Sequence, residues 1–165
     1  MSNITILAEA GAPIGPLGLI KLSGAQTGGS FSLVEHPLEP GRLVAPMHTH
    51  RHEDEYSFVL EGELMAQIGT EVVTAPAGTL ILKPRGVPHT VWNATAQPAR
   101  FLEIISPAGF ENYFVELAEI FAQPGPPDIE RVGALAQKYD LEFDFSTLAE
   151  LSQKYNVSLE GVNKS

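Results

Sequence analysis

Cysteine is absent from the 165 residues of this chain, and basic residues are scarce. Without thiols there is no disulfide framework and no thiolate nucleophile, so a metal site would have to use nitrogen and oxygen donors. The chain has 10 Lys and Arg residues against 20 Asp and Glu residues, which gives a formal net charge of -10. This balance argues against nucleic acid and against an anionic membrane surface as partners, because both attract basic patches.

Long apolar runs are also missing. No segment is long enough in apolar residues to span a bilayer. The first ten residues, MSNITILAEA, lack the basic start, apolar stretch and cleavage site of a signal peptide. We therefore expect a cytoplasmic protein, built as one domain or as one domain with an appendage.

Short β-type runs fill the chain up to about residue 107, and Gly or Pro recurs between them. This spacing favours an all-β sandwich or barrel over alternating strands and helices. Between two of the runs, Gly62 is free to take a positive φ angle and predicts a short hairpin connection. The expected strands are NITILA, LGLIKL, SFSLVE, RLVA, YSFVL, LMAQIG, EVVTA, TLILK, HTVWN and RFLEIIS.

After Pro107 the pattern becomes helical. Asp128 follows a proline-rich break and is placed to cap a second helix, and Ser146 precedes a third. We expect these amphipathic helices to cover the outside of the β domain or to form a dimer contact, and a lid over a pocket is the functional alternative. The first helix has one apolar stripe, formed by Phe110, Phe114, Leu117 and Phe121.

The segment MHTHRHEDE concentrates histidines and acids. On a strand, His48 and His50 would project from the same face and could reach one ion. Glu55 follows five residues later and needs a bulge or turn to join them. A His-x-His pair alone is a weak signal, but His89 in the distant segment GTLILKPRGVPHTVWN follows a tight turn and is a third candidate nitrogen donor.

These two segments resemble the two sequence motifs of the cupin superfamily. The resemblance covers roughly residues 24–106, and the short spacer between the motifs is typical of small single-domain bacterial members of the quercetin-dioxygenase-like group. The segment between Gly41 and His48 is one residue longer than in the family motif. The first motif is carried by Gly41, His48, His50, Glu55 and Gly62, and the second by Gly78, Pro84, Gly86, His89 and Asn93.

The resemblance implies a mainly β fold, a double-stranded β-helix or jelly-roll barrel at residues 1–108 with its motif core at residues 41–93. Residues 109–165 would form a short helical extension packed on the barrel or on a dimer partner. Because cupins commonly dimerise through their sheets, we expect a homodimer.

The resemblance also implies one divalent transition metal ion. Three imidazoles and one carboxylate suit Fe, Mn, Ni, Co, Cu or Zn. Four protein ligands leave an open position, as catalytic metal sites do. The implied ligands are His48, His50, Glu55 and His89.

Strand alternation extends this assignment to a pocket. If Glu55 and His89 face inward, then Ser57, Val59 and Val91 also face inward. Trp92 then points outward, toward the C-terminal helices. Met47 or Met65 is expected at the pocket mouth, and such a lining suits a small, partly apolar ligand.

Other polar residues near the motifs have simpler interpretations. A register that uses His50 and His52 is an alternative, although His52 fits the rim of the site better. Glu53 and Asp54 are expected in solvent, with a hydrogen bond from Asp54 to a ligand imidazole as the functional alternative.

Three further residues are expected at the surface. His36 stands beside Pro37 at a strand end. Lys83 and Arg85 flank the second motif, where either could also attract an anionic substrate.

Three functions are compatible with these residues. The first is a metal-dependent, dioxygenase-like oxidoreductase that acts on a small enol, phenol or diketone. Glu55 would be its catalytic residue, acting as a base with a pKa raised by apolar surroundings. The alternatives are a non-redox isomerase, lyase or hydrolase, and a small-molecule-binding cupin without turnover.

Overall fold

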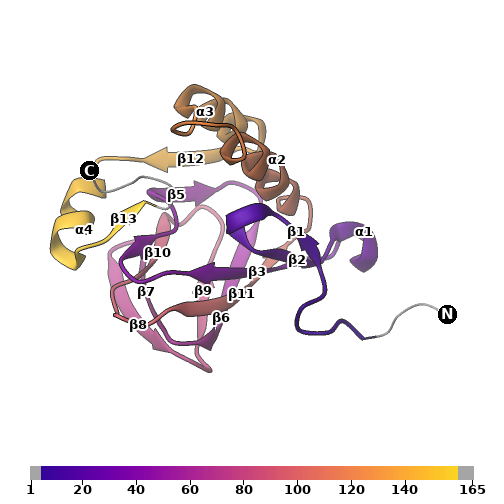
Figure 1. The fold of residues 1–165 in the computed structure, drawn as a ribbon, viewed down its shortest axis with the longest axis horizontal. Coiled ribbons are helices and arrows are strands. Elements are labelled where there is room, and N and C mark those ends of the chain that lie inside the picture. Colours follow the sequence, from indigo (N-terminus) through magenta and orange to yellow (C-terminus); the bar gives the residue numbers. More distant parts are fainter. Residues whose placement is uncertain (1–4, 160–165) are drawn as a thin grey trace.

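The computed structural model describes residues 5–159, which form two β-sheets with helices around them (Figure 1). The first sheet has the strand order β1 (Ala12–Pro13), β2 (Leu19–Leu22), β3 (Ser32–Leu38), β11 (Ala99–Ser106), β6 (Asp54–Glu61) and β9 (Leu80–Lys83). The second contains β12 (Leu141–Asp144), β5 (Met47–His50), β10 (His89–Asn93), β4 (Arg42–Leu43) and β13 (Ser158–Leu159) in that order. There β7 (Glu63–Ile68) also pairs with β10, and β8 (Glu71–Pro76) pairs with β7.

The two sheets face each other across a shared apolar interior. Its buried residues come from both sheets: Leu38, Val59, Leu64, Ala66, Ala75, Ile81, Val91, Ala99 and Phe101. Burying inward-facing residues of two stacked sheets is the main source of stability in such folds. The mainly β prediction is confirmed, but the sheets are not closed into a barrel, since within residues 5–159 no ladder joins them.

The predicted hairpin at Gly62 is wrong. β6 pairs with β9 and β11, whereas β7 pairs with β8 and β10, so the chain crosses from one sheet to the other at this glycine. Gly62 has a φ of 72°, and a Cβ there would lie 2.6 Å from the carbonyl oxygen of Pro98. Glycine is therefore required by close backbone approach as well as by its conformation.

The two chain ends depart from the predicted strand list. Residues 5–8 of the NITILA run form no strand, and residues 3 and 4 lie outside the described part of the chain. Ile6 and Leu7 are exposed, so no neighbouring strand or core favours an extended pairing there. β12 and β13 were not predicted, because both are too short for a periodic pattern to reveal.

The C-terminal helices appear where the pattern predicts them. They are α2 (Glu111–Phe121), α3 (Ile129–Lys138) and α4 (Leu148–Tyr155), and the shorter elements η1 (Gly15–Leu17) and α1 (Gly24–Thr27) precede the first motif. Asp128 caps α3 by accepting a hydrogen bond from the backbone nitrogen of Arg131, whereas α4 begins after Thr147 and not after Ser146. No helix within residues 5–159 is long and apolar enough to cross a membrane.

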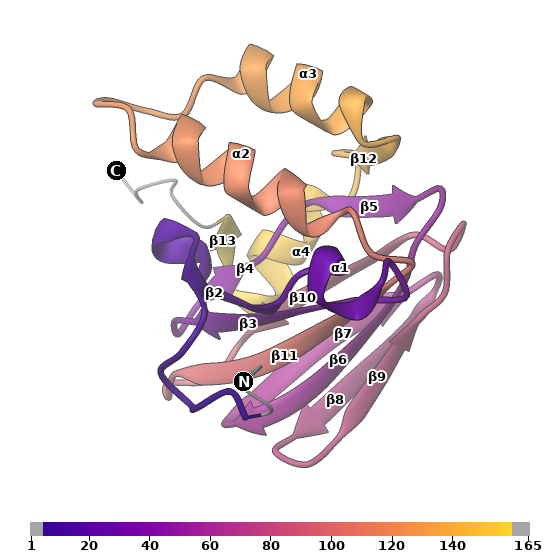
Figure 2. The same ribbon diagram turned by 90° about the vertical axis from the view of Figure 1, so that its right-hand side faces the viewer.

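Figure 2 shows α2 and α3 lying above β5, at the same end of the two sheets. Their apolar side packs on the first sheet, where Tyr113, Leu117 and Leu135 join Val34 and Ile105 in one buried cluster. The helices therefore close one end of the interior.

Candidate metal centre

The structure brings His48, His50, Glu55 and His89 together, and we call this group the His/Glu cluster. Two of its histidines alternate with Thr49 on β5, and His89 opens β10 directly opposite His48 in the antiparallel ladder. One nitrogen or carboxylate oxygen from each of the four residues lies within 4.8 Å of all the others. Strand alternation and the β5–β10 register thus produce the arrangement that the motifs predict.

Two imidazoles are anchored to the backbone through Nδ1. Nδ1 of His48 lies 2.9 Å from the carbonyl oxygen of Pro46, and Nδ1 of His89 lies 3.1 Å from that of Val87. Because a carbonyl oxygen can only accept, Nδ1 carries a proton in both rings. Nε2 of the neutral His48 ring therefore keeps its lone pair, whereas Nε2 of His89 is hydrogen-bonded to Oε2 of Glu55 at 3.2 Å. Burial lowers the pKa of His48 well below its usual value, with His89 as the next cause, and burial also lowers the pKa of His89. Both are therefore neutral, as metal binding requires.

Glu55 supplies the oxygen donor. Its Oε1 lies 3.4 Å from Nε2 of His50, and its Oε2 lies 3.2 Å from Nε2 of His89. Burial opposes ionisation, but the charges of His50 and Lys83 and the hydrogen bond to His89 hold the pKa of Glu55 well below its usual range. The expectation of a raised pKa is therefore wrong, and Glu55 is better suited to binding a cation than to taking a proton.

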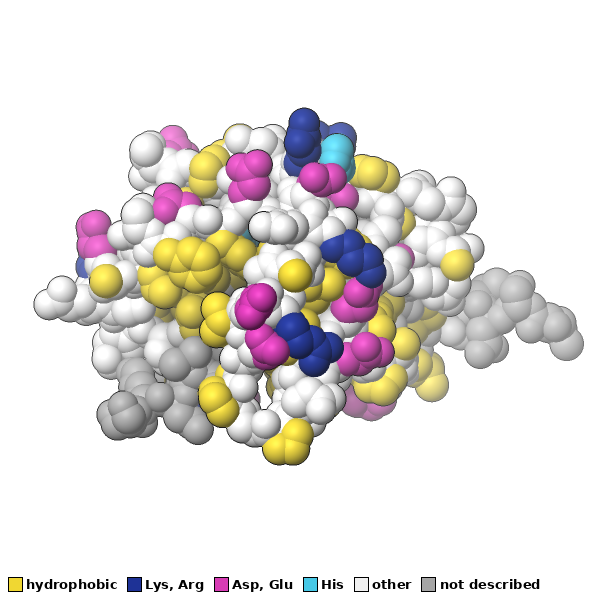
Figure 3. All heavy atoms as spheres, turned by 90° about the horizontal axis from the view of Figure 1, so that it is seen from above, with side chains coloured by type: hydrophobic (Ala, Val, Ile, Leu, Met, Phe, Trp, Pro, Cys, Tyr) yellow, Lys and Arg dark blue, Asp and Glu magenta, His cyan; other side chains and the backbone are white. Residues whose placement is uncertain are grey.

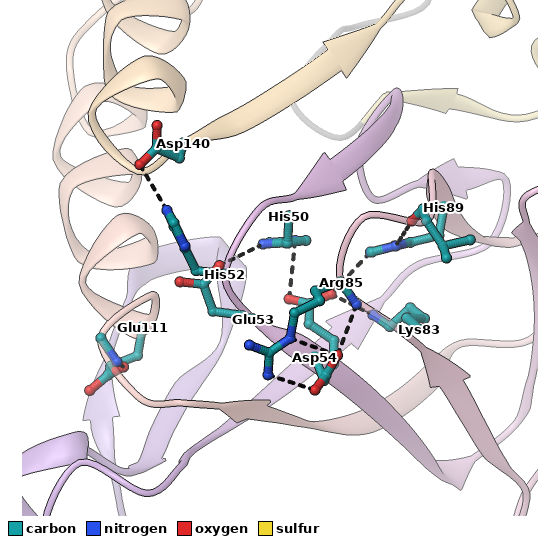
Figure 4. Close-up of polar contacts among 12 residues, drawn as sticks. His50, His52, Glu53, Asp54, Lys83, Arg85, His89, Glu111 and Asp140 are labelled. Atoms are coloured by element: carbon teal, nitrogen blue, oxygen red, sulfur yellow. Dashed lines mark hydrogen bonds and ion pairs between the residues drawn. The ribbon is translucent and has the colours of Figure 1, made fainter.

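Lys83 lies inside the molecule, so its predicted surface position is wrong. It is only 3% exposed, and its Nζ donates to Oε2 of Glu55 at 2.9 Å and to Oε2 of Glu103 at 2.6 Å. Burial lowers the pKa of Lys83, but the two carboxylates outweigh it and the net shift is upward. Figure 4 shows Lys83 pointing toward the cluster from its strand.

Glu103 is the second carboxylate of this buried network. It accepts a hydrogen bond from Oγ of Ser57 at 2.9 Å, and burial is the main cause that raises its pKa to about 7. The sequence motifs suggested a surface position for Lys83 and gave no role to Glu103. Alternation in LILK and RFLEIIS places them on the same inward faces as Ile81 and Phe101, which is the signal that could have found them.

His36 was expected at the surface, and this expectation is also wrong. It alternates with the buried Val34 and Leu38 on β3 and is only 8% exposed. Its ring packs against those of Phe101 and Phe114, with centroids 5.2 and 4.9 Å away. Burial lowers the pKa of His36 to about 4. The adjacent Pro37 is exposed on the opposite face, where it gave a misleading local signal.

The other polar residues of the first motif, His52, Glu53 and Asp54, do not belong to the His/Glu cluster. Nε2 of His52 lies 3.1 Å from a carboxylate oxygen of Asp140, and both side chains are more than half exposed. The alternative register with His52 as a ligand is therefore not the one that the structure has. Asp54 binds the exposed Arg85 rather than a ligand imidazole, whereas Oε2 of Glu53 lies 3.7 Å from Nδ1 of His50 (Figure 4).

The residues expected in the pocket divide between two faces. Val59 and Val91 belong to the interior cluster, and Ser57 donates its hydroxyl hydrogen to Glu103. Met47 does not lie at a pocket mouth, because alternation with the inward His48 turns it to the outer face. There Met47, with Met65 beside it, packs with Leu43, Trp92, Leu151 and Val157. Trp92 points outward as predicted, and its ring centroid lies 4.8 Å from that of Tyr155 in α4.

The C-terminal segment encloses the cluster. The ring of Phe110, just before α2, lies edge-on to His50 with centroids 4.4 Å apart. β12 adds a strand beside β5 and places Leu141 opposite His50 and Phe143 opposite His48. These aromatic and aliphatic groups form an apolar cover over one side of the cluster.

The surface above this cover shows no single dominant charge. Figure 3 looks down on the side that α2 and α3 cover, where acidic side chains are scattered. Basic side chains occupy separate places on this face rather than one continuous patch.

The residues present fit a transition metal ion. Three nitrogen donors and one oxygen donor converge, and the His48 imidazole is anchored through Nδ1 with its Nε2 lone pair available. Nδ1 of His50 is buried without a hydrogen-bond partner, with the Glu53 carboxylate just beyond hydrogen-bonding distance. A small shift would give His50 the outer-shell partner that metal-bound histidines usually have.

Comparison with known proteins points to one family. Residues 34–105 match the family model described as "Cupin domain", a range that includes the whole His/Glu cluster and ends before α2. No curated protein matches the chain.

Three solved structures illustrate the likeness. An uncharacterized conserved protein with a double-stranded β-helix domain from Klebsiella pneumoniae is 23% identical with a TM-score of 0.54, covering 66% of this chain and 93% of that one. A predicted oxalate decarboxylase from Thermotoga maritima is 26% identical with a TM-score of 0.50, covering 54% and 77%. A sugar phosphate isomerase from a cupin superfamily, from Silicibacter pomeroyi, is 28% identical with a TM-score of 0.47, covering 53% and 57%.

Proposed function

Since residues 34–105 match the cupin domain, we propose that the chain binds one divalent transition metal ion through the His/Glu cluster and acts as a metal-dependent enzyme. The observation that carries this proposal is the convergence of four donor atoms within 4.8 Å of one another. The donor set suits Fe, Mn, Ni, Co, Cu or Zn. Four protein donors would leave positions for a substrate on a five- or six-coordinate ion.

Our leading candidate is a dioxygenase-like oxidoreductase acting on a small enol, phenol or diketone. The ion would polarise the substrate and, if redox-active, supply the oxygen chemistry. The chain's own contribution is positioning and shielding. Phe110 and Phe143 keep water from one side of the cluster, and Glu55 stays ionised as a ligand.

A non-redox lyase is the second candidate. It is favoured by the likeness to the predicted oxalate decarboxylase, which is 26% identical with a TM-score of 0.50. A cupin that binds a small molecule without turnover would share the same cluster. Metal content and oxygen uptake separate these three functions.

Elemental analysis of the chain purified without a histidine tag tests the metal site. We expect about one metal ion per chain, and His48→Ala and His89→Ala each to lose most of it, because each removes one of four donors. His52→Ala is the matched control, since this histidine lies on the rim and pairs with Asp140. Full metal content in both ligand variants would refute the assignment.

Substrate tests then choose the reaction class. Oxygen consumption with enols, phenols or diketones would support the oxidoreductase, and carbon dioxide release from dicarboxylic acids without net oxygen uptake would support the lyase. If a compound binds in a metal-dependent way and no product forms, the result would support the small-molecule-binding function without turnover.

A further inference from the structure

A buried ammonium group stands behind the His/Glu cluster. Lys83 reaches it from β9, the neighbour of β6 in the first sheet, where Lys83 lies opposite Glu55 in the ladder. A buried cation must be paired to be tolerated. Its nearest carboxylate oxygen is Oε2 of Glu103, 2.6 Å from Nζ.

Lys83 also makes a second buried bond, to the His/Glu cluster itself. Nζ also donates to Oε2 of Glu55 at 2.9 Å, so one oxygen of the proposed ligand carboxylate is already engaged. The other oxygen, Oε1, lies 3.4 Å from Nε2 of His50 and carries no lysine contact. The ammonium thus makes the two oxygens of Glu55 unequal as metal donors, because electron density drawn toward Nζ weakens Oε2 as a ligand.

We propose that Lys83 is a positioning residue that limits Glu55 to coordination through one oxygen, Oε1. A six-coordinate ion held by three imidazoles and one carboxylate oxygen keeps two positions for a substrate. The inference rests on the proposed metal centre and sharpens it. It points to a small substrate that chelates through two oxygens, such as a dicarboxylate or an enolised diketone.

Glu103 and Ser57 hold the lysine in place. Oε2 of Glu103 accepts from both Nζ of Lys83 and Oγ of Ser57, which fixes the ammonium between two strands of the first sheet. If Glu55 instead bound through both oxygens, one position at most would remain, and a chelating substrate would have to displace a protein ligand.

The test compares two variants loaded with Co²⁺, whose visible absorption weakens as coordination rises from five to six. Lys83→Met with Glu103→Gln removes the ammonium without leaving an unpaired buried carboxylate. Glu103→Gln alone is the matched control, since it changes the same network but keeps the bond from Lys83 to Glu55. Oxalate serves as the chelating probe, measured by calorimetry on the same Co²⁺-loaded proteins.

We expect the wild type and Glu103→Gln to share one Co²⁺ spectrum and one oxalate affinity. The double variant should bind Co²⁺ with a changed spectrum and bind oxalate about tenfold more weakly, because a second Glu55 oxygen competes for the ion. An unchanged spectrum and affinity in the double variant would overturn the role of Lys83. An equal change in Glu103→Gln would overturn it as well, since the Lys83–Glu55 bond is intact there.

Two further measurements separate the possible failures. A wild-type chain that binds no Co²⁺ would refute the metal centre itself, and the positioning role with it. If the double variant does not fold, a crystal structure of the metal-loaded wild type decides the question without substitution. Glu55 bound through Oε1 alone supports the inference, and binding through both oxygens contradicts it.

Discussion

At the scale of single residues, ionisable groups in the interior set the character of the site. Lys83 and Glu103 form a buried pair against Glu55, and the resulting charges keep Glu55 ionised although burial opposes it. A buried pair of this kind seldom adds net stability, because desolvation offsets the Coulombic attraction. In this site, the Lys83–Glu103 pair fixes the position and the charge of Glu55.

The convergence of the His/Glu cluster was predictable from the sequence, because it follows from the two cupin-like motifs, with a His-x-His pair on one strand and a histidine after a turn. The burial of Lys83, Glu103 and His36 was not predicted. Charged and imidazole side chains are usually exposed, and that general preference outweighed the alternation of their strands. The structure shows that all three follow the alternation and are buried on the inward face.

His36 predicts a pH dependence of stability. Its pKa falls from 6.5 to about 4 on burial, so between these values the unfolded chain binds more protons than the folded one. Stability from this residue is fully present above pH 6.5 and is lost as pH falls toward 4. The loss at pH 5 relative to pH 7.5 is about 2 kcal/mol.

Urea unfolding of His36→Gln at both pH values measures this contribution. Glutamine does not titrate and can still donate to the carbonyl oxygen of Leu17, which lies 2.6 Å from Nδ1 of His36. We expect the loss of stability between pH 7.5 and 5 to shrink by about 2 kcal/mol. The control His52→Gln, at an exposed site, should keep the wild-type pH dependence, and a matching change there would contradict the assignment.

At the scale of elements, β5, which carries His48 and His50 of the His/Glu cluster, is paired on both sides. β10 pairs with β5 from within the second sheet, and β12 pairs with its other edge. The sequence predicts β10 from its regular pattern, but β12 has four residues after a helix and gives no periodic signal. Its pairing depends on α3 returning the chain to β5, which is a tertiary effect.

Helix α2 is predicted to be part of the core rather than a mobile lid. Leu117 is 8% exposed in the cluster that joins α2 to the first sheet, so Leu117→Ala should lower the free energy of unfolding by about 2 to 5 kcal/mol. Val115 on the same helix is 39% exposed, and Val115→Ala should cost less than about 1 kcal/mol. Urea unfolding measures both, and equally small losses would show that α2 contributes little to the fold.

At the scale of the whole molecule, the first sheet has an apolar outer face that α2 and α3 leave uncovered. Leu80 and Leu82 on its edge strand β9 are 50% and 56% exposed, and Phe58, opposite Leu80 on β6, is 36% exposed. Neighbouring apolar side chains on an open sheet edge invite association with another chain. The strand spacing and the motifs predicted the fold class. They did not predict which sheet face stays exposed to solvent, because that depends on where the C-terminal segment packs.

We propose that the homodimer expected from the family resemblance uses this face of β6 and β9. Leu82→Lys places a charge in the middle of such a contact, so it should weaken dimerisation at least about tenfold, corresponding to 1.4 kcal/mol. Ile129→Lys is the matched control, because Ile129 is 70% exposed on α3, away from the first sheet's edge. Sedimentation velocity over a range of concentrations measures both variants. A lysine ammonium is costly only where the partner covers it, so Leu82→Lys alone should weaken the dimer. The contact would be contradicted by a wild type that stays monomeric. It would also be contradicted by a dimer that Ile129→Lys weakens and Leu82→Lys does not.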